Sequence, residues 1–145
     1  MTAAESLRHF NGLGGFREDG TEYVIRLRRD GERLRLPPRP WINVVANERF
    51  GFLVSETGAG TTWRGNSREH RLTPWSNDPV SGPHDEAVYL LDEASGAGWS
   101  PFPGPIPGEG PYEMRHGFGL TRCRHASRGR EVEGWAATHV RVVQG

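Results

Sequence analysis

The sequence contains no lysine, one cysteine and no long hydrophobic run, and each of these features narrows the class of protein. All 18 cationic side chains are arginine, and 18 Asp and Glu residues balance them, so the formal net charge is zero. Proteins that follow a nucleic-acid backbone are usually basic, and nucleic acid is therefore not an expected partner. Arginine-favouring codon usage explains the missing lysine most simply. The alternative is that the guanidinium fork suits pairing with anions or sugar hydroxyls.

The lone cysteine, Cys123, rules out an internal disulfide and a thiol-based metal cluster. Its neighbours alternate as in a strand, which predicts a buried, unreactive thiol. The N-terminal residues lack the apolar stretch of a signal peptide, and no run approaches the roughly 18 apolar residues of a membrane helix. We therefore expect a cytoplasmic, soluble chain without a membrane segment.

No segment shows a sustained helical period, whereas 20 glycines and 11 prolines in 145 residues are typical of short strands joined by many turns. Five Trp, six Phe and three Tyr supply a core, which argues against disorder. Without an internal repeat or a composition break, residues 1–145 are predicted to form a single all-β domain.

Alternating apolar residues predict the strands. From Glu22 to Arg28, Tyr23, Ile25 and Leu27 share one face, and Asp30-Gly31 then marks a hairpin turn. Further strands are predicted at Trp41–Ala46, Phe50–Ser55, Ala87–Leu91, Phe118–His125 and Ala136–Val143, with a polar link at Ser127–Gly134 before the last. The long loops Pro74–Asp85 and Ser100–Pro111 are of a kind that is usually functional or covers a sheet edge.

The residues give little support for metal binding or independent catalysis. Six histidines are scattered, and the compact triplet His84-Asp85-Glu86 would place adjacent side chains on opposite faces of a strand. Glycosidic-bond hydrolysis needs two carboxylates across the scissile bond, and no pair can be recognised among the candidates. These candidates are Glu56, Glu69, Asp78, Asp85 and Glu86. The glycine clusters near residues 12–15 and 58–60 precede no helix, so we interpret them as turns rather than phosphate cradles.

The segment from Trp63 to Asp78, which begins WRGNSREHRLTPW, is the best candidate site. Tryptophan can stack on the apolar face of a pyranose while Arg, Asn and Glu side chains pair with its hydroxyls. The competing interpretation is that one tryptophan belongs to the core and the other anchors a loop. Because a predicted strand precedes the segment, we expect it at the rim of a sheet.

A set of motifs in a fixed order resembles glycoside hydrolase family 94, and in particular the N-terminal β-sandwich of its members. Among the members of this family, the motifs resemble most strongly the C-terminal region of cyclic β-1,2-glucan synthases. They resemble cellobiose and chitobiose phosphorylases more distantly. The resemblance covers about Phe10 to His125. It rests on Asn11-Gly12, Gly14-Gly15-Phe16, Glu22-Tyr23-Val24-Ile25, Pro40-Trp41-Ile42-Asn43, Phe50-Gly51-Phe52, Ser55-Glu56-Thr57-Gly58, Asn66-Ser67-Arg68-Glu69, Leu72-Thr73-Pro74-Trp75-Ser76-Asn77-Asp78-Pro79 and Arg115-His116-Gly117.

The resemblance implies an antiparallel β-sandwich of the galactose-mutarotase-like super-sandwich type, here incomplete. In such enzymes a following (α/α)6 barrel carries the catalytic acid and binds inorganic phosphate. No catalytic residue can be transferred to this sequence, and no cofactor is implied for it. The tail after Ser127 departs from the expected pattern, so a truncation or split gene is one interpretation. A full-length synthase would lie at the inner membrane.

Three functions follow. The first is a non-catalytic carbohydrate-binding or scaffolding module whose partners are a β-linked glucan or gluco-oligosaccharide and a barrel in cis or trans; the family's dimers make a homodimer a candidate assembly. The second is an assembly module without sugar affinity. The third is a small mutarotase-like enzyme using His70, Glu69 or His116. By analogy, the expected sugar contacts are Trp63, Arg64, Asn66, Arg68, Glu69, Trp75, Asn77, Asp78 and a turn at Arg115-His116.

Overall fold

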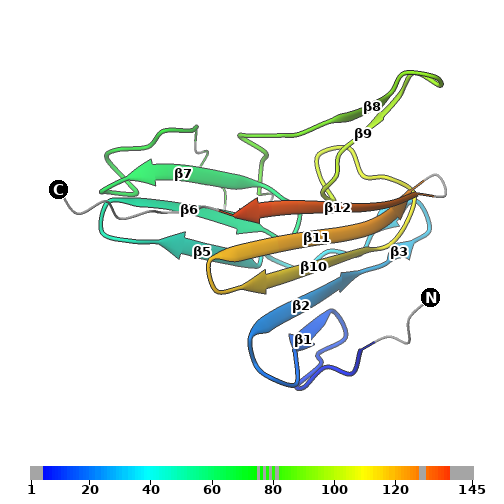
Figure 1. Ribbon diagram of the computed structural model, residues 1–145, viewed down its shortest axis with the longest axis horizontal. Coiled ribbons are helices and arrows are strands. Elements are labelled where there is room, and N and C mark those ends of the chain that lie inside the picture. The colour runs from blue at the N-terminus through cyan, green and yellow to red at the C-terminus, as the bar shows by residue number, and fades with distance from the viewer. Residues whose placement is uncertain are drawn as a thin grey trace.

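The computed structural model describes residues 5–74, 76, 78, 80, 82–127 and 130–137, with residues 127 and 130–137 described by their backbone alone. Within these ranges the chain forms strands and turns and no helix (Figure 1). The strands are β1 (Gly14–Phe16), β2 (Glu22–Leu27), β3 (Arg29–Asp30), β4 (Arg33–Leu34), β5 (Ile42–Ala46), β6 (Phe50–Ser55), β7 (Gly60–Arg64), β8 (Leu90–Asp92), β9 (Ala97–Trp99), β10 (Tyr112–Gly117), β11 (Leu120–Ser127) and β12 (Arg130–Ala137).

Every strand pair is antiparallel, which confirms the predicted all-β class. A five-stranded sheet has the order β1-β2-β10-β11-β12, and a three-stranded sheet has the order β5-β6-β7. The remaining strands form two short hairpins, β3-β4 and β8-β9, the second of which projects from the body of the molecule (Figure 1). In the larger sheet β2 pairs with β10, 85 or more positions further along the chain, so the fold depends on pairing that is distant in sequence.

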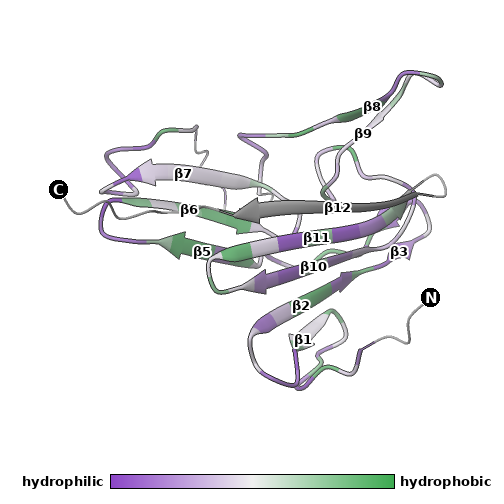
Figure 2. Ribbon diagram, in the orientation of Figure 1, coloured by the Kyte–Doolittle hydropathy of each residue, from purple (hydrophilic) through white to green (hydrophobic). Residues whose placement is uncertain are grey.

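The five-stranded sheet has one apolar face and one charged face, as the period of two in β2 predicts. Tyr23, Ile25 and Leu27 lie on the inner face. The core there consists of Ile25, Leu27, Tyr112, Met114 and Cys123, with Tyr23, Leu34, Trp41 and Phe102 packed against it. Figure 2 shows the contrast between the green residues of β5 and β6 and the largely purple β10 and β11.

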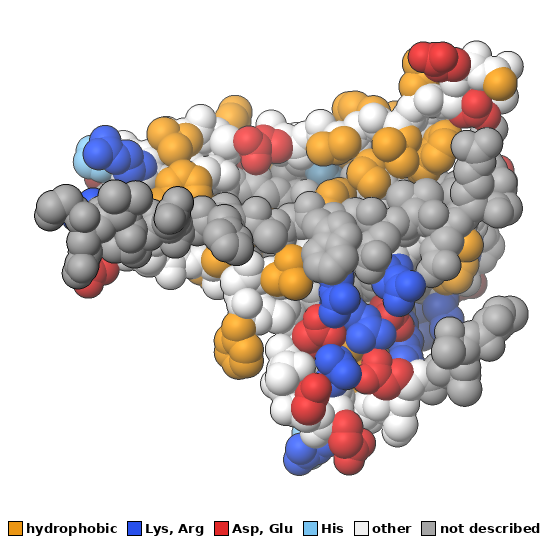
Figure 3. Space-filling view, in the orientation of Figure 1, with side chains coloured by type: hydrophobic (Ala, Val, Ile, Leu, Met, Phe, Trp, Pro, Cys, Tyr) orange, Lys and Arg blue, Asp and Glu red, His pale blue; other side chains and the backbone are white. Residues whose placement is uncertain are grey.

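The outer face of the same sheet is a mosaic of opposite charges over β2, β10 and β11 (Figure 3). Glu22 accepts from Arg122 at 2.6 Å and from Arg115 at 3.3 Å. Arg26 pairs with Glu113 at 3.3 Å. Burial alone raises the pKa of the Glu22 carboxyl, but Arg122 and Arg115 together hold that pKa below its ordinary value. The charges on this face therefore satisfy one another.

The two sheets are joined through Asn43, whose side chain points from β5 toward the β10–β11 turn. Its Nδ2 lies 2.9 Å from the Gly117 carbonyl oxygen, 3.1 Å from that of Leu120 and 3.1 Å from Thr121 Oγ1. Alternation then places the neighbours Ile42 and Val44 on the opposite, outer face of the small sheet. These side chains are 50% and 55% exposed. One hydrogen-bonding side chain thus decides which face of β5 is turned outward.

Most strand predictions are confirmed, and three need correction. The predicted Phe50–Ser55 strand is observed with the same bounds, and the turn at Asp30-Gly31 joins β3 to β4, with Gly31 at φ 63°. The predicted turn at Arg115–Gly117 is instead the end of strand β10. The strand predicted at Ala87–Leu91 is the shorter, shifted β8.

The third correction concerns the C-terminal part of the chain. The predicted polar link Ser127–Gly134 is largely the start of β12, whose backbone pairs with β11 at the edge of the sheet. Residues 138–143 of the predicted Ala136–Val143 strand lie outside the described residues. Within the described ranges no helix has the length and apolarity needed to cross a bilayer.

Replacing Asn43 by Asp is expected to lower the free energy of unfolding by about 2 kcal/mol, because the carboxylate cannot donate to the carbonyls of Gly117 and Leu120. Urea denaturation followed by tryptophan fluorescence measures the change. Asn66→Asp is the matched control, since the hydrogen bonds that the Asn66 side chain makes to described residues run through its acceptor Oδ1, toward the N–H groups of Arg68 and Glu69. Equal stability of Asn43→Asp and the wild type would contradict the assigned role.

The Cys123 thiol is expected to stay unreactive in the folded chain. It is fully buried, donates to the Pro101 carbonyl at 3.4 Å, and has its pKa raised to about 12 by burial. A thiol-specific colorimetric reagent at pH 8 should label the protein only after denaturant is added. Rapid labelling of the native protein would show that the core around β11 opens.

Candidate functional site

The Trp63–Pro74 part of the predicted site folds back along β7. Gly65, at φ 68°, turns the chain, and its N–H donates to the Arg49 carbonyl at 2.7 Å. The returning segment then bonds to β7, since Arg64 N–H donates to the His70 carbonyl and Leu72 N–H to that of Thr62, both at 2.9 Å. The predicted location at a sheet rim is therefore confirmed for this part. The return also covers the outer edge of β7.

Asn66 organises the tip of this turn. Its Oδ1 accepts from the backbone N–H groups of Arg68 at 2.8 Å and Glu69 at 3.0 Å, an Asx turn that bends the chain locally. Arg68 and Glu69 pair side chain to side chain at 3.4 Å and are 85% and 66% exposed. Because Asn66 shapes the backbone, Arg68 and Glu69 project into solvent, where they can reach a ligand.

Trp63 lies with its indole over Gly51, its partner on β6. A methyl group built on Gly51 would lie 2.5 Å from Cε2 and 2.8 Å from Nε1 of the ring, so only glycine permits this position. The ring lines a cleft of about 590 Å³ on the outer face of the small sheet. The other residues of this cleft, hereafter the tryptophan cleft, are Val44, Leu53, Thr61, Ser67, Arg68 and Arg71.

A second, more polar cleft of about 690 Å³ lies around the turn. Three arginines, one histidine and two glutamates supply most of its lining, so it presents donors and acceptors at many angles. These residues are Glu48, Arg49, Arg64, Glu69, His70 and Arg71. Arg71 also lines the tryptophan cleft, so the two hollows share a wall.

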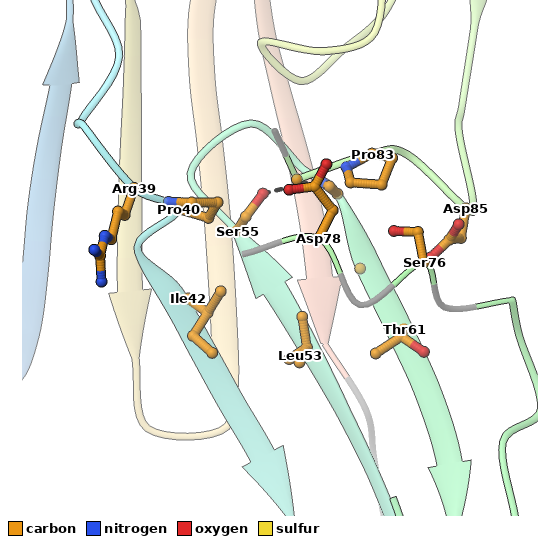
Figure 4. Close-up of a pocket in the computed structure, with 13 residues that line it drawn as sticks. Arg39, Pro40, Ile42, Leu53, Ser55, Thr61, Ser76, Asp78, Pro83 and Asp85 are labelled. Carbon is orange, nitrogen blue, oxygen red and sulfur yellow. Dashed lines mark hydrogen bonds between the residues drawn. The ribbon is translucent and has the colours of Figure 1, made fainter. Parts of the chain in front are cut away.

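Asp78 belongs to a third hollow, of about 290 Å³, next to the tryptophan cleft (Figure 4). Ile42, Leu53 and Thr61 project from the small sheet to form its floor. The loop above contributes Ser76, Asp78, Pro83 and Asp85 to the lining, and Arg39 points away from the two carboxylates. An apolar floor under carboxylates and hydroxyls suits a small polyhydroxylated ligand.

The structure thus brings together six of the ten residues predicted from the sequence. Trp63, Arg64, Arg68 and Glu69 line the first two clefts, Asn66 shapes the turn between them, and Asp78 lines the third. Trp75 and Asn77 lie outside the described residues. The sequence reasoning missed Val44 and Leu53 as cleft residues and Gly51 as the residue beneath the Trp63 ring. The alternation of the two flanking strands carried the signal, because it places all three on the face of Trp63.

Arg115 and His116 do not join this group, because both lie on β10 in the large sheet. The Arg115 guanidinium is held by carboxylates on the charged face, with Glu113 at 2.7 Å and Glu5 at 3.0 Å. Glu22 lies 3.3 Å away. The adjacent His116 faces the other way. A sugar-binding role for these two residues stays a prediction that the geometry does not favour.

His116 is partly buried between the sheets, and both of its ring nitrogens are hydrogen-bonded. A carbonyl only accepts, so Nε2–H donates to the Trp41 carbonyl at 3.2 Å. Nδ1 then accepts from the Thr121 hydroxyl at 3.0 Å, and that hydroxyl accepts from Asn43 at 3.1 Å. This chain fits the neutral imidazole, and burial lowers the pKa of His116.

Glu56 is the most buried of the candidate catalytic carboxylates. Its Oε2 accepts from the Trp41 N–H at 2.7 Å, and burial raises the pKa of its carboxyl. The residue is 3% exposed and holds the start of β5. Glu69, by contrast, lies in solvent at the turn. Within the described ranges no three His, Cys, Asp or Glu side chains gather as metal ligands would.

These features define a class: an antiparallel all-β domain whose ligand-accessible clefts lie on the outer face of one sheet. The chain belongs to glycoside hydrolase family 94, since residues 21–138 match the model described as "Glycosyl hydrolase 94, supersandwich domain". The predicted family resemblance is thereby confirmed. The galactose-mutarotase-like relationship stays a prediction.

The relatives are much longer enzymes. The chain is 44% identical over 134 residues to the cyclic beta-(1,2)-glucan synthase NdvB of Rhizobium meliloti (strain 1021), an alignment that covers 92% of this chain and 5% of the synthase. It is 30% identical over 112 residues to the N,N'-diacetylchitobiose phosphorylase of Vibrio proteolyticus, covering 75% of this chain and 13% of the phosphorylase. It is 30% identical over 119 residues to the 3-O-beta-D-glucopyranosyl-beta-D-glucuronide phosphorylase of Paenibacillus borealis, covering 81% of this chain and 13% of that phosphorylase.

The stability of the chain is expected to fall as pH drops from 7.5 to 5.5. The unfolded His116 takes up a proton near its ordinary pKa of 6.5, whereas the folded residue, with its lowered pKa, does not. Its contribution to stability is therefore complete above pH 6.5 and is lost below it. Thermal melts across this range should give a smaller slope for His116→Gln, which keeps a donor toward Trp41.

His84 and His125 also have pKa values lowered by burial, so a residual slope is expected in the His116→Gln variant. The double variant His84→Gln/His116→Gln should flatten the dependence further. A wild-type melting temperature that rises on acidification through this window would contradict the assignment of neutral buried imidazoles.

Proposed function

We propose that this chain is a non-catalytic, carbohydrate-contacting supersandwich module of an enzyme that makes or phosphorolyses β-linked glucans. Family membership supports the kind of enzyme, and two of the relatives, the glucan synthase and the glucuronide phosphorylase, are named for beta-linked saccharides. The observation that carries the sugar contact is the outer face of the small sheet. There Trp63 and a polar turn rich in Arg and Glu line adjoining clefts.

Three of the candidate acid or base groups are poorly placed for catalysis, either because they are already hydrogen-bonded or because they are exposed. Glu56 is buried against the Trp41 N–H, and both nitrogens of His116 are hydrogen-bonded. Glu69 is exposed beside Arg68. Chemistry would therefore come from elsewhere in the enzyme, and the proposal assigns it, with phosphate binding, to an (α/α)6 barrel acting in cis or trans.

One observation favours a second function, that of an assembly module without sugar affinity. β5 is an edge strand whose residues carry no charge, and uncharged edges are open to pairing with another strand. Phe118, at the turn between β10 and β11, is 92% exposed. Static light scattering that shows a monomer at all concentrations would remove this alternative. The mutarotase-like alternative has less support, because both ring nitrogens of His116 are hydrogen-bonded within the protein. An anomer-interconversion assay without turnover would remove it.

Calorimetric titration of the full chain with β-1,2-gluco-oligosaccharides tests the proposed function. We expect binding with a dissociation constant on the order of 1 mM, because shallow exposed clefts provide little buried area. Maltooligosaccharides, which are α-1,4-linked, are the control and should bind at least several-fold more weakly. The proposal fails if the chain binds no β-glucan alone and none after a family barrel domain is supplied in trans.

A further inference from the structure

We propose that Trp63, packed against Gly51, is the stacking platform for a single gluco-configured pyranose ring, and that Gly51 is its positioning residue. This inference rests on the proposed function and deepens it, since it names the ring geometry that the tryptophan cleft accepts. It also assigns a role to a strand glycine that makes no contact with the ligand itself.

The platform is built by cross-strand pairing. Gly51 pairs with Trp63 on one side and with Ala46 on the other, so three neighbouring residues of the small sheet share the outer face. Because a Cβ on Gly51 would overlap the Cε2–Nε1 edge of the indole, the ring covers the glycine backbone. A larger residue at position 51 would push the ring away from the sheet and into the space above it.

The adjacent row of the sheet extends the apolar floor. Val44, Leu53 and Thr61 are paired in register across β5, β6 and β7, and all three line the tryptophan cleft with Trp63. Val44, on the edge strand β5, is 55% exposed. Val44 thus gives this floor an apolar surface that water reaches.

Polar groups border this floor on the side of the turn. Ser67, Arg68 and Arg71 line the same cleft, and the Arg68 side chain is 85% exposed. The indole N–H of Trp63 has no hydrogen-bond partner among the described residues and is not one of their buried unpaired atoms. A ligand on the platform would therefore find a flat apolar surface with donors at one edge.

This arrangement favours one class of sugar ring. A β-glucopyranosyl unit carries its hydroxyls equatorially, so its axial C–H groups present apolar faces while its hydroxyls point outward in the ring plane. The faces suit an indole and the rim suits arginine and serine donors. A mannopyranosyl ring differs by an axial hydroxyl at C2, which places a polar group on one of these faces.

A purely structural role for the pair is the competing account, because an aromatic ring often covers a strand glycine across a sheet. In that account Trp63 protects the backbone of β6 and no ligand response is expected from it. The two accounts differ in the behaviour of the Trp63 indole N–H during a sugar titration, which NMR detects directly.

The test is a ¹⁵N–¹H NMR titration of the full chain with a β-1,2-linked glucose disaccharide, observing the five tryptophan indole signals, with Trp63 assigned by its loss in Trp63→Phe. We expect the Trp63 signal to shift most, and the matching mannose disaccharide to bind several-fold more weakly. Trp63→Ala should weaken binding about tenfold. Gly51→Ala should weaken it comparably by displacing the ring.

Gly98→Ala is the matched control, because a Cβ on that strand glycine would meet only the Leu90 carbonyl at an ordinary 3.7 Å. It should bind as the wild type does, and thermal melts of all variants separate unfolding from lost affinity. Disaccharide binding that leaves the Trp63 signal and the Trp63→Ala affinity unchanged overturns the platform while the proposed function stands. An absence of any β-glucan binding, with or without a barrel domain, overturns both.

Discussion

The arrangement of this domain depends on a directional chain of hydrogen bonds between its two sheets. Asn43 donates to Thr121, Thr121 donates to His116, and His116 donates to the carbonyl of Trp41. Each group has one role that its neighbours fix, so the chain is satisfied only in the neutral state of the imidazole. This hydrogen-bond chain starts at Asn43 on β5 and ends at Trp41, just before β5. It therefore holds the Asn43 face of the small sheet toward the core.

The two outward faces of the molecule consequently differ in kind. On the large sheet, Arg115 lies within ion-pair distance of both Glu22 and Glu113, and these charges are largely neutralised in place. On the small sheet, Val44 and Trp63 meet solvent beside a turn whose arginines and glutamates project outward. A surface whose polar groups already pair with one another gains little free energy from binding a ligand. An open apolar floor with polar edges gains more, because a ligand covers the apolar area and pairs with the edges.

Local features predicted much of the architecture, and pairing over long distances limited the rest. Alternation located β2 and β6, and Asp30-Gly31 located a hairpin, because such patterns are read within a few residues. β10 was missed because Glu113 and Arg115 look like loop residues until their partners, far away along the chain, are known. The Arg115-His116 pair was grouped with the Trp63 segment by family analogy, yet alternation on β10 sends its two side chains to opposite faces.

The sequence by itself determined the all-β class, the family, the burial of Cys123 and the polar-aromatic character of the Trp63–Asp78 segment. These properties follow from composition, short-range alternation and ordered motifs. Only the tertiary structure decided that Trp63 packs against Gly51, that Val44 and Leu53 share its cleft, and that His116 joins the two sheets. Those relations depend on strand register and on which face of β5 is turned inward, and no local stretch of sequence contains either.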